Sequence, residues 1–160
     1  MNASNPRRRF FQEATAFSVG VGLARSSSLD VTAPMPIIDT HQHLWDLSRF
    51  TLPWLRGAAK LDRSFLMSDY RKATEGLNIV KSVYMEVDVE PAQQAAEADY
   101  VLELINRGEM PLVAAVISGR PGSNGFADFI ARYREHRPIK GLRRVLHGPE
   151  TAPGHSPIAR

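Results

Sequence analysis

The stretch PIIDTHQHLWD, residues 36–46, decides the fold and the candidate site. It places two of the five histidines of the chain, His41 and His43, at the end of a short apolar run. Side chains of an extended strand alternate between its faces, so Ile37, Asp39, His41 and His43 are expected on one face. Two imidazoles on one face can bind a single divalent metal ion. The alternative is a polar turn whose histidines hydrogen-bond to the backbone.

Downstream of Pro34, strand and helix patterns alternate along the chain. The residues between 44 and 64 lack a clear period and predict an extended loop. Strands are predicted within 35–39, 79–89, 110–118 and 138–147, and helices within 68–77, 90–108 and 125–136. The second helix has one apolar face, formed by Ala98, Val101, Leu102 and Ile105. Strands separated by amphipathic helices indicate parallel βαβ units and an α/β fold.

Polar residues follow two more of the predicted strands. Glu86 and Asp88 close the second strand, and Arg143 and His147 lie on and just beyond the fourth. Together they suit an anionic or hydroxylated substrate, because arginine pairs bidentately with carboxylates. The alternative for Arg143 is a solvated strand end. In the loop, Trp45 is interpreted as a packing residue and Asp46 as a loop cap.

Composition excludes several classes of protein. The chain has 160 residues, a formal net charge of +3 and no cysteine, which excludes disulfides and cysteine-based zinc sites. Its basic residues are mostly local clusters, so neither a nucleic-acid partner nor a membrane partner is predicted. No apolar run is long enough for a transmembrane helix.

The N-terminal 33 residues differ from the rest. PRRRFFQ, residues 6–12, is followed by a weakly apolar stretch and then by a small, polar one. This layout resembles a twin-arginine export signal, with Arg7, Arg8, Phe10 and Phe11 at the matching positions. Residues 1–33 are therefore predicted to be a signal peptide and linker, which makes the protein periplasmic or exported. A basic N-terminus without that role would leave it cytoplasmic.

Four stretches together resemble the amidohydrolase-related family. They are PIIDTHQHLWD, then PWL at 53–55, VYMEVD at 83–88 and IKGLRRVLH at 139–147. The most similar branch contains sugar lactonases of the L-fuconolactonase and L-rhamnonolactonase type and 2-pyrone-4,6-dicarboxylate lactonase. The resemblance implies a TIM (β/α)8 barrel of the metal-dependent hydrolase type that hydrolyses a lactone.

The same resemblance implies roles for individual residues. His41 and His43 become the catalytic pair that binds a metal, with zinc as the expected ion, or that binds substrate directly, since metal dependence varies within this branch. Glu86, Arg143 and His147 become substrate-binding residues. The catalytic groups of such barrels lie at the carboxyl ends of the strands.

The length of the chain departs from that family. A full barrel needs roughly 250 residues, and the chain after residue 33 has about half of that. We therefore expect a partial barrel of about four strands and three helices over 34–148, the N-terminal half, followed by a disordered tail at 149–160. The late catalytic residues have no counterpart, so little activity is expected from this chain alone. Two alternatives remain: a non-catalytic subunit that self-associates or pairs with a complementary C-terminal half, and a decarboxylase of the same superfamily.

Overall fold

The computed structural model describes residues 34–146. Within them lies one four-stranded parallel sheet in the order β1-β2-β3-β4. The strands are β1 (Ile37–Gln42), β2 (Ile79–Met85), β3 (Leu112–Ser118) and β4 (Ile139–Arg143). The helices are α1 (Met67–Ala73), α2 (Gln94–Asn106) and α3 (Phe126–Tyr133), with short 3-10 helices at Pro53–Leu55 and Pro91–Gln93. The expected α/β fold and partial barrel are confirmed.

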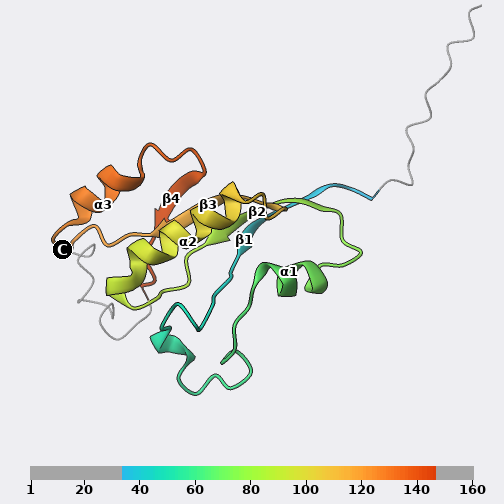
Figure 1. Ribbon diagram of the computed structural model, residues 1–160, viewed down its shortest axis with the longest axis horizontal. Coiled ribbons are helices and arrows are strands. Elements are labelled where there is room, and N and C mark those ends of the chain that lie inside the picture. Colours follow the sequence, from blue (N-terminus) through green and yellow to red (C-terminus); the bar gives the residue numbers. More distant parts are fainter. Residues whose placement is uncertain (1–33, 147–160) are drawn as a thin grey trace, which may run out of the picture. The chain divides into compact units, whose positions relative to one another are not determined.

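The strand order explains the layering. Each parallel crossover steps to the next strand in the same direction, and such crossovers are almost always right-handed, so the connecting helices fall on one face of the sheet. Helix α2 packs against β3 on that face (Figure 1), and its Glu97 accepts a hydrogen bond from Tyr84 of β2. All four strands therefore direct their carboxyl ends to one edge, where the active sites of such barrels lie.

Helix α2 is the main cover of the sheet. Its predicted apolar face is confirmed, because Ala98 and Val101 are fully buried, Leu102 is buried and Ile105 packs against the core. Gly108 ends this segment with a φ of +72°, a left-handed conformation that suits glycine. The same helix also buries a charged residue, Glu97, which the apolar pattern did not predict.

Helix α1 begins differently from the prediction. It was predicted within 68–77, and it spans Met67–Ala73 with Leu66 as its N-cap. The carboxylate of Asp69 accepts a hydrogen bond from the Leu66 N–H at 2.9 Å and satisfies one of the free backbone donors of the first turn.

The predicted loop between β1 and α1 folds inward. Five of its apolar side chains join the core: Leu44, Trp45, Phe50, Leu52 and Leu55. Trp45 is 7% exposed and donates its indole N–H to the Arg63 carbonyl at 2.7 Å, which confirms its packing role. Asp46 accepts hydrogen bonds from the Ser48 N–H and Oγ–H, which confirms the loop cap.

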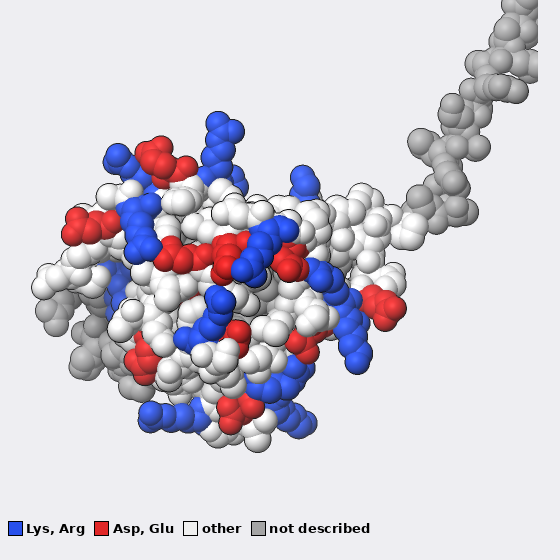
Figure 2. Space-filling model, viewed as in Figure 1, with Lys and Arg blue, Asp and Glu red and all other residues white. Residues whose placement is uncertain are grey.

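The surface over α2 carries charges of both signs. Acidic and basic side chains alternate on the face that Figure 2 shows, where no large area of a single sign is visible. Two acidic residues of α2 form ion pairs there. Glu103 pairs with Arg49 and Arg107, and Asp99 pairs with Arg132. No helix within residues 34–146 is long and apolar enough to cross a membrane.

The core under α2 gives a stability prediction. Leu112 is 1% exposed in β3, so Leu112→Ala should lower the free energy of unfolding by about 2–5 kcal/mol through lost burial and a residual cavity. Leu77→Ala is the matched control, because Leu77 is 57% exposed and should cost far less. Urea denaturation of the full chain measures both; equal effects would contradict this assignment of the core.

Candidate functional site

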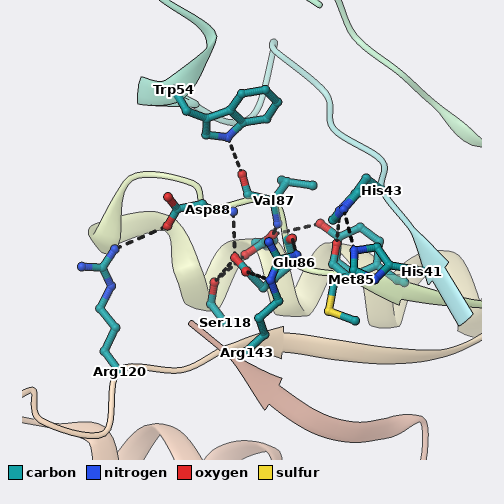
Figure 3. Close-up of polar contacts among 12 residues, drawn as sticks. His41, His43, Trp54, Met85, Glu86, Val87, Asp88, Ser118, Arg120 and Arg143 are labelled. Atoms are coloured by element: carbon teal, nitrogen blue, oxygen red, sulfur yellow. Dashed lines mark hydrogen bonds and ion pairs between the residues drawn. The ribbon is translucent and has the colours of Figure 1, made fainter. Parts of the chain in front are cut away.

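The two histidines of the opening motif converge at the end of β1. His41 Nε2 lies 3.1 Å from His43 Nε2 (Figure 3). His43 Nδ1 donates to the carbonyl of Met85, the last residue of β2, at 2.9 Å. That donation places the ring hydrogen of neutral His43 on Nδ1, so Nε2 presents a lone pair toward His41. Burial lowers the pKa of His43, which favours this neutral form.

The intervening residue, Gln42, turns the opposite way. It is 2% exposed, accepts a hydrogen bond from Ser82 Oγ at 2.7 Å and points its amide at Met67 of α1. Gln42 therefore anchors the motif to the helix-covered side of the sheet. The anchor leaves His41 and His43 on the other side, as their spacing predicted.

Asp39 does not share the face of the histidines, so that part of the predicted alternation is wrong. Its carboxylate accepts the Tyr70 hydroxyl of α1 at 2.8 Å and the His41 N–H at 3.0 Å. The cause is a register shift between Asp39 and Gln42, which pair with Ser82 and Tyr84 of β2. An extra residue in a strand reverses the side-chain alternation beyond it.

Glu86 and Arg143 meet at the ends of β2 and β4. Arg143 Nε lies 3.2 Å from Glu86 Oε1, and Arg143 Nη1 donates to the Glu86 backbone carbonyl at 3.3 Å. Glu86 is 1% exposed, whereas the Arg143 side chain is 30% exposed. The sequence predicted both residues at the site, and the structure brings them together. The solvated alternative for Arg143 does not describe this position.

Backbone geometry holds the Glu86 carboxylate in place. Asp88 has a φ of +53°, and its N–H reaches back to Glu86 Oε2 at 2.7 Å. Aspartate tolerates this left-handed conformation better than most residues. Burial raises the pKa of Glu86, and the Asp88 N–H and the Arg143 charge oppose that rise.

A cavity of about 350 Å³ joins these groups. It is lined by His43, Trp45, Trp54, Leu61, Glu86, Val87, Asp88, Arg143 and Val145. Trp54 donates its indole N–H to the Val87 carbonyl at 2.6 Å, so the loop is fixed against the end of β2 (Figure 3). The cavity is a mostly apolar pocket with a few converging polar groups, as is usual for sites that bind small molecules.

The histidine pair fits a shared metal ion. Two nitrogens bound at ~2.0–2.1 Å to one tetrahedral zinc ion lie about 3.3 Å apart, close to the observed 3.1 Å. Two ligands do not complete a zinc site. Residues 34–146 contain no group of three or more histidine, aspartate and glutamate side chains that could hold a metal ion. His147, the remaining predicted site residue, lies outside the described residues, as do residues 1–33 and the predicted tail.

Three polar residues behind the cavity were not predicted. Ser118, at the end of β3, lies between the carboxylates of Glu86 and Glu97, and Glu97 also accepts the Tyr84 hydroxyl. One signal was present in the sequence, because Glu97 falls four residues before Val101 on the predicted buried face of α2.

Known proteins resemble this chain over part of their length. No protein-family model matches it. The uncharacterized protein y4mH of Sinorhizobium fredii is 28% identical over 128 residues, which are 69% of this chain and 40% of that protein. A crystal structure of an amidohydrolase from Burkholderia multivorans with bound zinc is 22% identical, with a TM-score of 0.56, over 71% of this chain and 39% of that one. Amidohydrolase 2 from Bifidobacterium longum subsp. infantis is 30% identical, with a TM-score of 0.44, over 54% and 34%.

The comparison with the zinc-containing structure supports the fold. The similarity covers 71% of this chain, so the chain has the fold of part of that barrel. The chain spans about two fifths of the length of the proteins it matches.

The Glu86–Arg143 pair gives a prediction that needs no substrate. Arg143→Gln should leave the buried Glu86 carboxylate without its cation and lower the free energy of unfolding at neutral pH by about 2 kcal/mol. The double variant Glu86→Gln/Arg143→Gln should recover part of that loss, because both charges are gone. Chemical denaturation of the two variants and of Glu86→Gln completes the cycle. Strictly additive losses would contradict the pairing.

Proposed function

We propose that this chain forms part of the active site of a hydrolase of the amidohydrolase-related family that opens a sugar lactone or a carboxylated lactone. The observation on which this depends is the convergence of His41 Nε2 and His43 Nε2, 3.1 Å apart, at the edge where the strands end. Beside the pair lies a cavity with an arginine in its wall. Fold and motif agree with the proposal, since a structure with the same fold contains zinc.

On this proposal, the histidines hold a divalent metal ion. His43 is prepared for that role, because its Nδ1–H is held by Met85 and its Nε2 lone pair is free to bind. When bound, the ion would supply a Lewis acid that activates water and polarises an ester carbonyl. Further ligands would come from residues outside 34–146.

Arg143 orients the substrate. Its Nε and Nη1 face Glu86, and within residues 34–146 its Nη2 has no hydrogen-bond partner. That nitrogen can donate to a substrate carboxylate or hydroxyl inside the cavity. Glu86 fixes the guanidinium plane and thereby sets the direction of the remaining N–H groups.

The rest of the site is proposed to come from a complementary half of the barrel, whether in the same polypeptide or in another one. In the described part of the chain, β1 and β4 are the outer strands of the sheet. Ile37 and Ile38 of β1 are 41% and 57% exposed, so apolar surface is available for pairing. The group that deprotonates the attacking water would belong to that half.

Zinc binding tests the proposal through a readout separate from activity. The full chain should bind zinc, and His41→Ala or His43→Ala should weaken binding at least ~10-fold, because each variant removes one of two ligands. Isothermal titration calorimetry measures the affinity, and cobalt absorption reports the coordination. His136→Ala is the matched control, since His136 is exposed and distant in sequence from the pair.

Hydrolysis is then assayed on lactones with and without a carboxylate, alone and with the complementary half. If Arg143→Gln still binds zinc but no longer hydrolyses a lactone that carries a carboxylate, the result would support the role of Arg143 in binding the substrate. Zinc affinity unchanged in both histidine variants would overturn the metal role. Release of carbon dioxide from an aromatic acid without lactone hydrolysis would favour the decarboxylase alternative.

We further propose that residues 1–33 direct twin-arginine export. A reporter fused to these residues should reach the periplasm, and Arg7→Lys/Arg8→Lys should abolish its export, because the paired arginines are the recognised feature. Cell fractionation measures the outcome. Conversion of Arg25 to lysine, outside the paired motif, is the control, and equal export of both variants would exclude the twin-arginine route.

A further inference from the structure

A buried hydroxyl connects two carboxyl groups behind the cavity. Ser118 Oγ lies 3.1 Å from Glu86 Oε2 and 3.2 Å from Glu97 Oε2. The serine is 2% exposed, and both glutamates are 1% exposed. A hydroxyl has a single hydrogen to donate, so it can serve one of the two carboxylates. If both glutamates were ionised, the other contact would place two electron-rich oxygens together with no hydrogen between them.

One additional proton resolves this conflict. If a carboxyl group is protonated, it donates to Ser118 Oγ, and the serine hydroxyl then donates to the other carboxylate. The three groups would form a directed chain of hydrogen bonds. The remaining question is which glutamate holds the proton.

The surroundings assign the proton to Glu97. Glu86 has a cation beside it, Arg143, and accepts the Asp88 N–H. Glu97 Oε1 accepts the Val87 N–H at 2.8 Å and the Tyr84 hydroxyl at 2.9 Å, both of which are neutral donors. Within residues 34–146, Glu97 has no ion pair. The charged group that Ser118 links to it is the Glu86 carboxylate, whose negative charge disfavours ionisation of Glu97.

We propose that Glu97 is a positioning residue of the cavity, a neutral carboxylic acid that donates to Ser118 and thereby aims the serine hydroxyl at Glu86. Glu86 in turn holds Arg143 at the cavity wall. Helix α2 is thus linked through β3 and the end of β2 to an arginine on β4. Figure 3 shows the part of this link formed by Ser118, Glu86 and Arg143. Glu97 is not among the residues that line the cavity. It reaches the lining residue Val87 through a direct hydrogen bond and Glu86 through Ser118, so it acts through other residues.

Electrostatics agree with this arrangement. Burial raises the pKa of Glu97 from 4.5 to about 7, and the nearby Glu86 charge adds to the rise against the hydrogen bonds of Val87, Tyr84 and Ser118. Because the folded state holds the proton more tightly than the unfolded chain, the stability from this group is complete below pH 4.5 and is lost as pH rises through about 7. Above that pH, two carboxylates would compete for one hydroxyl, and the hold on Arg143 should loosen.

The proton's location can be tested without any substrate. Carbon-13 NMR of the side-chain carboxyl groups of the full chain should show Glu97 titrating near pH 7. Glu97→Gln should fold, because its amide can donate to Ser118 and its carbonyl can accept from Val87 and Tyr84. In this variant the unfolding equilibrium constant should lack the rise of up to ~10-fold per pH unit that the wild type shows between pH 4.5 and about 7. Glu103→Gln, on the exposed side of α2, should keep that rise.

The positioning role has its own readout, hydrogen exchange at Arg143 Nε. At pH 8 the exchange should be about 10-fold faster in the wild type than in Glu97→Gln, since Glu97 would then be mostly ionised. Ser118→Ala removes the bridge and should give fast exchange at pH 6 as well. An ordinary carboxyl titration near pH 4.5, or equal Arg143 exchange in the wild type and Glu97→Gln at pH 8, would overturn the inference. The effect on substrate binding rests on the proposed function, but neither of these measurements does.

Discussion

The sequential order of four parallel strands is the constraint on which the rest of the structure depends. Because each crossover steps to the next strand, the helices cover one face and the carboxyl ends of all strands meet at one edge. Residues separated by a hundred positions thereby become neighbours, as His43 of the β1 end and Arg143 of β4 do at one cavity. In a parallel sheet that reversed its order midway, the carboxyl ends would still share one edge, but the helices would cover both faces.

Polar anchors on the covered side determine what faces the open side. Gln42 is held by Ser82 and contacts Met67, so the histidines on either side of it must turn away. Ser118 and Glu97 act similarly behind Glu86. A buried polar group needs its partners, since an unsatisfied one costs about 1–3 kcal/mol. Each anchor therefore resists rotation of its strand end and fixes the exposed side chain beside it.

The sequence predicted those parts of the molecule that depend on periodicity. Residue spacing and the positions of strand ends predicted the four strands, the apolar face of α2 and the paired histidines. They also predicted Glu86 and Arg143 as site residues. Asp39 was misplaced because a register shift is a property of strand pairing, which one strand does not reveal. Glu97 was missed because charged residues are almost never buried unless paired, and its partners come from β2 and β3.

The carboxylates near the cavity already have hydrogen-bond or ion-pair partners. This bears on which catalytic steps this part of the barrel could perform and which would need the complementary half. Asp39 is held by Tyr70 and Glu86 by Arg143, and Glu97 is buried behind Glu86, to which Ser118 links it. Asp88 lines the cavity and lies 3.8 Å from Arg120. On the proposed function, this part of the barrel binds and orients the substrate, because His43 and Arg143 line the cavity. Proton transfer would then depend on a group from the complementary half of the barrel. That group would need to be free of an ion-pair partner that lowers its affinity for a proton.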